Sequence, residues 1–350
     1  MIVRWGLAEL PEACREAGVA APLVVAGPRW DDLELGVSGL EAPSAEPSVP
    51  GQNTGRLAAP REHARWREVP SHRLDEAAAQ ASGADGVLAV GGGSAIDLGK
   101  AISAATGLPL VSVPTTYSGA EWTTYFGVRD PERRMRGGGS GARPTAIVYE
   151  PELTLELPRE TTVGTALNAL AHCAEALYAA GHNAAADEEA RAGARLISEW
   201  LPRVVDSPHD REARTELLRG ACHGGAALAG SMLALAHALA QAVGGRYGLP
   251  HGTLNGICLP PVLRFNAAFV PDAVRRFGEA IGAEDPAARV EELAQLARPD
   301  GGGATRLRDL GVPDQDLPEL AAAAAQRGGN QANPHVATAE EVEPLLRAVW

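Results

Sequence analysis

The pattern of apolar residues changes near residue 155, and this change constrains the fold more than any other feature of the sequence. Before it, short apolar runs alternate with helical segments; after it, long segments rich in Ala, Leu, Glu and Arg follow one another. The apolar runs are LVVAG (23–27), GVLAVGGG (86–93), LPLVSVP (108–114) and TAIVYEP (145–151), with helical patterns at 73–84 and 94–107. Strands that alternate with helices predict a mostly parallel sheet covered by helices. We expect an α/β domain over residues 1–155 and an all-α domain over residues 156–350.

The second half is predicted to be helical almost throughout. Helical patterns cover 160–180, 183–205, 210–231, 232–245, 269–281, 287–297, 316–327 and 338–349. Two stretches interrupt the first half. Residues 38–62 are rich in Pro, Ser and Gly, which predicts a mobile or simply solvated loop. Residues 130–144 are basic and glycine-rich, which predicts a flexible hairpin or lid.

Charge and cysteine content exclude several classes of protein. The 350 residues carry 31 basic and 44 acidic side chains, a net charge of −13, which argues against nucleic acid or an anionic membrane as partner. No run of roughly 18 apolar residues could cross a membrane, and the first residues lack the apolar core of a secretory signal. Four widely spaced cysteines (Cys14, Cys173, Cys222 and Cys258) indicate free thiols rather than disulfides or a zinc cluster. A cytoplasmic protein is expected.

The segment GGGSAID (91–97) lies where a predicted strand passes into a helix. Glycines let a backbone approach a phosphate closely, and a helix N-terminus offers unpaired N–H groups. Gly91, Gly92, Gly93 and Ser94 would form such a cradle, with Ser94 as the N-cap and Asp97 three residues later. The segment matches neither GxGxxG nor the Walker A motif, so a plain tight turn remains the alternative.

Polar side chains follow the next predicted strand, in PTTYSGAE (114–121). Thr115, Thr116, Tyr117 and Ser118 stand at the carboxyl end of that strand, where open α/β sheets bind ligands. An ordinary polar turn is the alternative interpretation.

The helical half contains histidines at spacings that suit a shared site. Asn168 and His172 lie four residues apart on one helix face, as do His237 and Gln241, and His251 follows. Imidazoles from several helices can converge on one metal ion, although each taken singly is more often a core or surface residue. Of the other histidines, His223 is expected in the core, and the surface is expected for His63, His72, His182, His209 and His335.

Together these segments resemble the iron-containing alcohol dehydrogenase superfamily, and most closely its maleylacetate reductase branch. The likeness is carried by PTTYSGAEWT (114–123), IVYEPELTLELP (147–158), ALNALAHCAEALYAA (166–180) and VGGRYGLPHGTLNGICLPPVLRFN (243–266), after the glycine segment. It implies a dehydroquinate synthase-like fold: a Rossmann-like dinucleotide-binding domain, a helical domain, and an active site in the cleft between them. It also implies a homodimer.

The resemblance assigns roles to the matching positions. Residues 91–94 and Asp97 would hold the pyrophosphate of NADH or NADPH, and Thr115, Thr116 and Ser118 would adjoin the nicotinamide. Metal-dependent members bind Fe²⁺ or Zn²⁺ through one Asp and three His. The matching positions here are Asn168, His172, His237 and His251. Asn168 therefore replaces the Asp, which lowers the expected affinity for a metal, so this site could be empty.

Three further positions depart from the family pattern. Gln241 replaces a histidine, Arg134 takes the place of a lysine, and Asn333-Pro334-His335 replaces Asn-Pro-Arg. Arg134 and Gln241 are predicted to contact the substrate. Arg29, where NAD-binding domains often carry an acidic residue, would tolerate a ribose 2′-phosphate.

The implied reaction is hydride transfer to the C=C bond of maleylacetate or a related unsaturated oxo-acid, giving 3-oxoadipate. His172, His237 and His251 would stabilise the developing enolate oxygen and donate a proton, and Tyr117 would position the substrate. Two alternatives stay open. One is a tailoring reductase or metal-dependent alcohol dehydrogenase that acts on another carbonyl compound. The other is a cofactor-binding protein without redox activity.

Overall fold

A computed structural model describes residues 1–37, 64–297 and 305–350 of the chain. The chain divides into two compact units. The first unit comprises Met1–Pro114, Thr124–Pro131 and Arg136–Glu150, and the second comprises Thr115–Thr123, Glu132–Met135 and Pro151–Trp350. The segment after the predicted strand at 108–114 thus belongs to the helical unit, and a single boundary between residues 155 and 156 stays a prediction. The loop predicted at 38–62 lies outside the described residues.

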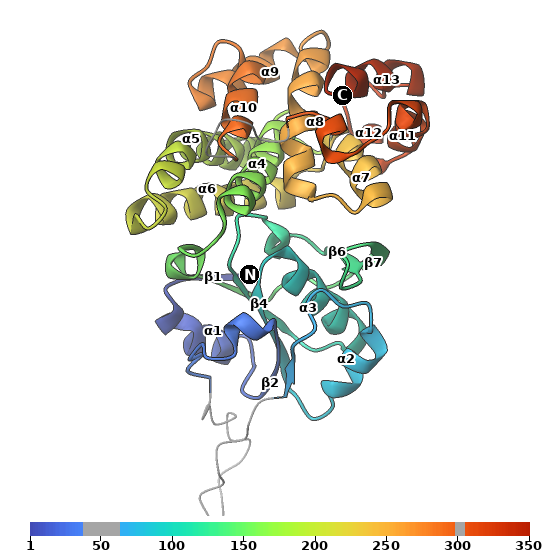
Figure 1. Ribbon diagram of the computed structural model, residues 1–350. Coiled ribbons are helices and arrows are strands. Elements are labelled where there is room, and N and C mark those ends of the chain that lie inside the picture. The colour runs from blue at the N-terminus through green and yellow to red at the C-terminus, as the bar shows by residue number, and fades with distance from the viewer. Residues whose placement is uncertain (38–63, 298–304) are drawn as a thin grey trace, which may run out of the picture. The chain divides into compact units, whose positions relative to one another are not determined.

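The first unit is built on a six-stranded sheet in which every paired strand is parallel (Figure 1). Its order is β1-β8-β5-β4-β2-β3. The strands are β1 (Ile2–Trp5), β2 (Pro22–Ala26), β3 (Arg65–Trp66), β4 (Gly86–Gly91), β5 (Leu110–Pro114) and β8 (Ala146–Tyr149). The helices are α1 (Leu10–Glu16), α2 (Leu74–Gln80) and α3 (Gly93–Thr106), with a 3-10 turn η2 (Pro28–Trp30) after β2. The sheet, α2 and α3 agree with the sequence-based prediction, whereas β1, β3 and α1 were not predicted.

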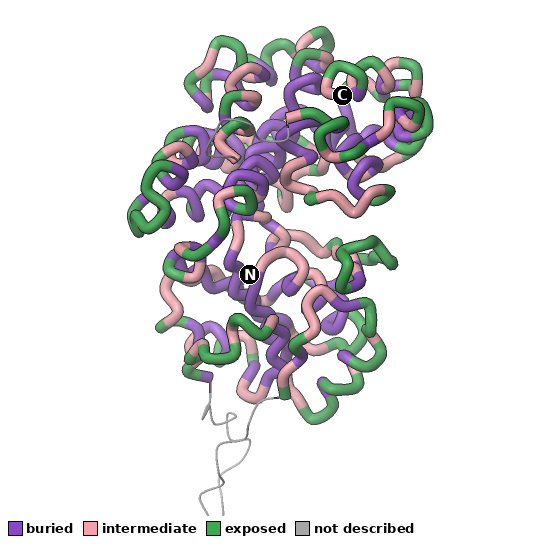
Figure 2. The backbone as a smooth tube through the Cα atoms, viewed as in Figure 1, coloured by how far each residue is buried: buried purple, intermediate pink, exposed green. Residues whose placement is uncertain are grey.

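The central strands are buried along their whole length, as expected for a sheet with helices on both faces. Leu23, Val25, Val87 and Ala89 from β2 and β4 pack with Ile102 of α3 in one apolar cluster. Figure 2 shows the central strands as buried segments. This packing fixes β2, β4 and β5 side by side, so their carboxyl ends form one edge.

A second, two-stranded sheet is formed by β6 (Tyr125–Arg129) and β7 (Met135–Ser140). The expected hairpin is therefore present but displaced: β6 lies entirely before the predicted range of 130–144, which contains only the turn and β7 of the hairpin. β7 is exposed at every residue. Whether this hairpin acts as a lid stays a prediction.

The second unit is helical, as predicted. Short 3-10 turns lie at η3 (Ala120–Trp122), η4 (Pro151–Thr154), η5 (Leu307–Leu310) and η6 (Asp314–Asp316). The helices are α4 (Arg159–Ala176), α5 (Ala184–Asp206), α6 (Arg211–Gly230), α7 (Leu235–Tyr247), α8 (His251–Asn266), α9 (Pro271–Ile281), α10 (Pro286–Gln295), α11 (Leu317–Ala325), α12 (Gly328–Gln331) and α13 (Ala339–Ala348). From Thr162 to Ala176, α4 is buried almost continuously.

Helix α8 was not expected from the sequence. It contains Pro260 and Pro261, which remove backbone donors and normally end a helix. Its residues are buried from Leu254 to Leu263, so tertiary packing holds it against local preference. At its start, a Cβ on Gly252 would collide with the carbonyl oxygen of Gly164. This close approach places the first turn of α8, and His251 with it, against α4.

No single helix of the described residues is long and apolar enough to cross a membrane, and α6 with α7 meets that test only as a pair bent by 101°. All four cysteines are free, as expected, and only Cys222 is not fully buried.

Candidate functional site

The glycine segment lies at the carboxyl end of β4 and opens α3. Gly91 adopts φ 148°, and a Cβ there would lie 2.8 Å from Cβ of Ala95, so only glycine fits. Gly92 is the N-cap of α3, and no side chain caps this end. The predicted N-cap, Ser94, instead lies inside the first turn. That prediction was wrong, because the N-cap lies two residues earlier, at Gly92. The N–H group of Ala95 bonds to the carbonyl oxygen of Gly92, so the first N–H groups of the helix, at Gly93 and Ser94, are the ones left to a ligand or to water.

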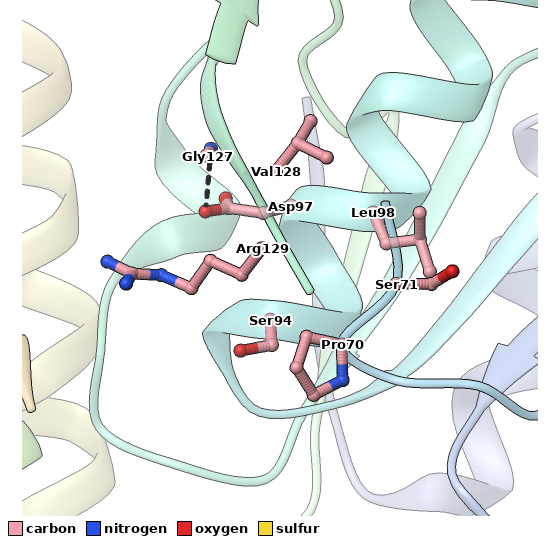
Figure 3. Close-up of a pocket in the computed structure, with 8 residues that line it drawn as sticks. All are labelled: Pro70, Ser71, Ser94, Asp97, Leu98, Gly127, Val128 and Arg129. Carbon is pink, nitrogen blue, oxygen red and sulfur yellow. Dashed lines mark hydrogen bonds between the residues drawn. The ribbon is translucent and has the colours of Figure 1, made fainter. Parts of the chain in front are cut away.

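Ser94 and Asp97 line a small hollow beside the first turn of α3 (Figure 3). Asp97 accepts a hydrogen bond from the backbone N–H of Gly127 at 3.1 Å and pairs with the buried Lys100 at 3.0 Å. Asp97 therefore fastens β6 to α3. Both of these contacts are structural, and the predicted contact of Asp97 with the cofactor stays a prediction.

Arg29 stands at the same edge of the sheet as the glycine segment. β2 and β4 are paired through Ala26 and Val90, and the indole nitrogen of Trp30 lies 3.9 Å from the position of a Cβ on Gly91. The guanidinium of Arg29 lies over the ring of Trp30, 4.3 Å from its centre. An exposed cation thus stands close to the predicted phosphate cradle.

Tyr117 is anchored inside the second unit. Its side chain is fully buried, and its hydroxyl accepts a hydrogen bond from Arg214 of α6 at 3.2 Å. Arg214, itself buried, also donates to Thr162 at 3.1 Å. Burial raises the pKa of Tyr117, while the Arg214 guanidinium opposes that rise. These contacts favour a structural role for Tyr117 over the predicted contact with substrate.

The neighbours of Tyr117 form the rest of the segment that follows β5. Thr115 is buried, and the buried hydroxyl of Thr116 has no hydrogen-bond partner. The carbonyl oxygen of Ser118 accepts a hydrogen bond from the side-chain amide of Asn168 at 2.8 Å. This segment is thereby tied to α4.

The structure brings His172, His237 and His251 together. The rings of His172 and His237 stack with centres 4.9 Å apart, and those of His237 and His251 lie 5.5 Å apart. They come from α4, α7 and α8 respectively. Both Nδ1 of His172 and Nε2 of His237 are buried without a hydrogen-bond partner. Burial, and then the neighbouring imidazoles, lower the pKa of His172 well below its usual value, so this ring is neutral at pH 7.

Glu175 orients His237. A carboxylate oxygen of Glu175 lies 2.6 Å from Nδ1 of His237, and both side chains are closed to solvent. The same carboxylate accepts the backbone N–H groups of Ala234 at 2.7 Å and of His237 at 3.1 Å. A carboxylate on Nδ1 places the proton there and leaves the buried Nε2 unprotonated in the neutral ring.

Two side-chain amides occupy the positions around the predicted metal site. Asn255 of α8 donates to the amide oxygen of Asn168 at 2.6 Å and lies 3.1 Å from Nε2 of His251. The amide nitrogen of Asn168 lies 3.3 Å from Nε2 of His172. N–H groups of these amides thus face the ring nitrogens that would bind a metal, and the carboxylate of Glu175 is held on Nδ1 of His237.

These residues do not fit a divalent ion. Throughout residues 1–37, 64–297 and 305–350, no group of three or more His, Cys, Asp or Glu side chains is arranged to hold a metal. A donor set of three imidazoles and an amide also supplies less charge to a divalent ion than one Asp and three His would. Asn168 and the three histidines therefore form a polar cluster rather than a coordination sphere.

The two predicted substrate contacts differ in setting. Arg134 is exposed and pairs with Glu132 at 3.3 Å. Gln241 lies one turn after His237 on α7, and its amide oxygen accepts a hydrogen bond from Arg327 at 3.5 Å.

The remaining histidines of the described residues lie apart from the cluster. His335 stacks on Phe269, with ring centres 4.2 Å apart, and lies 3.0 Å from Glu341. His223, expected in the core, is instead 38% exposed and lies 2.6 Å from Glu189. That prediction was wrong because its face of α6 meets the polar side of α5. The surface histidines confirmed as exposed are His72, His182 and His209, while His63 lies outside the described residues.

Sequence reasoning missed Glu175, Asn255, Arg214 and Arg327. The first had a signal: a carboxylate three residues after His172, in an otherwise apolar Ala-rich helix, needs a buried partner. The other three carry no local signal, because their partners lie on distant segments.

Family comparisons agree with this architecture. Residues 162–350 match the Fe-containing alcohol dehydrogenase family, C-terminal, and residues 64–151 match iron-containing alcohol dehydrogenase. The chain belongs to the iron-containing alcohol dehydrogenase family.

Its relatives include maleylacetate reductases. The chain is 36% identical to that of Pseudomonas knackmussii over 98% of this chain and 93% of that protein. It is 38% identical to that of Burkholderia cepacia over 81% of this chain and 79% of that protein. Among solved structures, a putative alcohol dehydrogenase from Ralstonia eutropha JMP134 superposes with a TM-score of 0.84 at 32% identity, covering 100% of this chain and 95% of that one. Maleylacetate reductase from Rhizobium sp. strain MTP-10005 gives 0.83 at 27%, with the same coverage.

Proposed function

We propose that this protein reduces maleylacetate, or a closely related unsaturated oxo-acid, with NADH or NADPH. One observation carries the proposal: Glu175 holds the ring of His237 so that its Nε2 is buried without a hydrogen-bond partner. This atom lies inside a cluster of imidazoles that does not suit a metal. The identity of 36% to a maleylacetate reductase over nearly the whole chain supports the choice of substrate.

The family implies a nicotinamide dinucleotide, and the first unit suits one. Gly91, Gly92, Gly93 and Ser94 offer an uncapped helix N-terminus to a pyrophosphate, and the strict need for glycine at 91 supports close backbone approach. When bound, the reduced nicotinamide supplies a hydride. Thr115, Thr116 and Ser118 are proposed to adjoin the nicotinamide, and the unpartnered hydroxyl of Thr116 supports this.

The histidine cluster is proposed to handle the charge that the reaction creates. Addition of hydride to a C=C bond conjugated with a ketone places negative charge on the ketone oxygen. His237 Nε2 would hydrogen-bond that oxygen or deliver a proton, and the carboxylate of Glu175 offsets the ring's positive charge while Nε2 carries a proton. His172 and His251 flank this atom. An enolate is less basic than a simple alkoxide, so imidazoles can stabilise it without a Lewis acid.

The family also implies a divalent ion in its metal-dependent members. Because Asn168 and Asn255 direct amide groups at the ring nitrogens of His172 and His251, no step of this proposal involves a metal. The homodimer and the cytoplasmic location are further parts of the proposal, drawn from the family resemblance.

A second candidate is reduction of a different carbonyl substrate. Gln241 replaces a family histidine, and His335 is engaged by Phe269 and Glu341 rather than open to a ligand. Both differences would change the residues that bind the substrate, without changing hydride transfer from the nicotinamide.

The test is oxidation of NADH and of NADPH by the purified protein with maleylacetate, with and without a chelator. Rapid oxidation that the chelator leaves unchanged is expected. Absence of oxidation, although the cofactor binds, would overturn maleylacetate as the substrate and favour the second candidate.

A further inference from the structure

Arg327 is a cation without a matching anion. It lies between α11 and α12, and its side chain is partly buried. Its Nε is buried and has no hydrogen-bond partner, and no ion pair of the described residues includes it. Burial alone lowers the pKa of Arg327. Arginines that are withdrawn from water in folded proteins usually pair with a carboxylate. An unpaired guanidinium here therefore either destabilises the folded protein or serves to bind an anionic ligand.

The guanidinium lies along the helix that carries His237. Its Nη1 donates to the amide oxygen of Gln241 at 3.5 Å, and Nη2 lies 3.7 Å from the position of a Cβ on Gly245. Gln241 and Gly245 follow His237 by one and two turns of α7, and each turn advances the helix by roughly 5 Å. The absence of a side chain at Gly245 keeps this approach open. A fixed positive charge therefore stands about one to two turns from the imidazole cluster.

The geometry points to Arg327 as the residue that binds a carboxylate of the substrate. This inference rests on the proposed function, since it assigns the recognition of an oxo-acid to the same site. A guanidinium binds a carboxylate through two parallel N–H···O bonds, a geometry that an ammonium cannot reproduce. In maleylacetate the carboxylates lie two and three bonds from the ketone carbon. With hydrogen bonds of roughly 3 Å at each end, such a molecule can reach from the imidazoles to Arg327.

Two alternative cations are less suited to this task. Arg134 is exposed and already pairs with Glu132. His335, at the position of the family's C-terminal arginine, stacks on Phe269 and faces Glu341. Arg327 differs from both because its only described side-chain partner is the neutral Gln241, which leaves its charge available.

The experiment uses binding and turnover together on the full chain. Adipate serves as an unreactive dicarboxylate probe, and hexane-1,6-diol as its uncharged counterpart, both titrated by calorimetry. In Arg327→Met we expect adipate affinity to fall and KM for maleylacetate to rise, each at least about tenfold, with kcat changed far less. Arg327→Lys should recover only part of the loss. Arg195→Met, an exposed arginine 3.9 Å from Glu199 on α5, is the matched control.

A further variant keeps the arginine in place. Gln241→Glu places a carboxylate beside the guanidinium of Arg327, where it competes with the carboxylate of a ligand. This variant should therefore lower the affinity for adipate as Arg327→Met does, and it provides a test even if Arg327→Met folds poorly. Unchanged adipate affinity in both variants, or no adipate binding by the wild type, overturns the inference. Adipate binding that depends on Arg327, without oxidation of NADH by maleylacetate, overturns the proposed function alone. Turnover of maleylacetate with unchanged KM in Arg327→Met overturns the inference alone.

Discussion

Nδ1 of His237 and a carboxylate oxygen of Glu175 lie 2.6 Å apart, with both side chains removed from solvent. The same carboxylate accepts two backbone N–H groups at the start of α7, so one acidic side chain on α4 fixes both the ring and the helix that carries it. The other ring nitrogen, Nε2, is buried without a hydrogen-bond partner, in a ring that contacts both neighbouring imidazoles. Glu175 therefore positions the ring on which the proposed chemistry depends.

Replacing this carboxylate should lower turnover more than binding. Glu175→Gln keeps an oxygen for the backbone donors but offers an amide N–H group to Nδ1, which favours the wrong tautomer of His237. We expect kcat to fall by roughly 10–100-fold, with cofactor affinity unchanged. The matched control is Glu189→Gln, whose partner His223 lies at the same 2.6 Å on the surface. Equal effects of the two variants would contradict this role.

His237 itself should matter more than any other imidazole. His237→Ala removes the only ring that contacts both of the others, and we expect kcat to fall by roughly 10²–10⁴-fold in steady-state assays. His223→Ala should leave the rate unchanged because that ring lies outside the cluster. Full activity of His237→Ala would exclude it as the group that stabilises the enolate oxygen.

Tyr117 should affect stability rather than turnover. Tyr117→Phe removes the acceptor of one hydrogen bond from the buried Arg214, whose other acceptors, Thr162 among them, remain. We expect the free energy of unfolding to fall by about 1 kcal/mol, measured by urea denaturation, with kcat/KM preserved. A large loss of kcat/KM at unchanged stability would restore the predicted contact with substrate.

A carboxylate in the cluster should create the missing affinity for a metal. The wild type is expected to bind Zn²⁺ weakly at this site, and Asn168→Asp to bind it at least about tenfold more tightly, because it adds a negative charge beside the imidazoles. Calorimetry with Zn²⁺ measures the difference. The gain should disappear when Asn168→Asp is combined with His172→Ala. A tight, stoichiometric metal site in the wild type would show that the cluster is a coordination sphere after all.

Arg29 should decide between the two nicotinamide cofactors. Arg29→Glu places a negative charge beside the predicted phosphate cradle, so KM for NADPH should rise about tenfold while KM for NADH changes little. Initial rates with both cofactors test this. Arg15→Glu, an exposed arginine of α1, is the control. Equal effects on both cofactors would show that Arg29 does not contact the 2′-phosphate.

The sequence alone determined the division of this chain into two kinds of architecture. Apolar runs of strand length, each followed by glycine or proline, predicted β2, β4, β5 and β8, because a strand buried on both faces must be apolar throughout. Long Ala-rich periodic segments likewise predicted α4, α5 and α6. The spacing of Asn168 and His172 placed them on one face of α4, since residues four apart are neighbours on any helix.

Tertiary structure decided what these side chains do. Glu175 meets His237 and Asn255 meets Asn168 only because α4, α7 and α8 pack together, and no local pattern encodes a contact across 62 or 87 residues. Packing also holds α8 as a helix against two prolines, and Arg214 of α6 meets the buried Tyr117. Local sequence sets helix and strand periodicity, which depend on near neighbours. Hydrogen-bond partners and burial depend on which helix faces, distant in sequence, pack together. For His237, one of nine histidines, that packing places it at the centre of the proposed site.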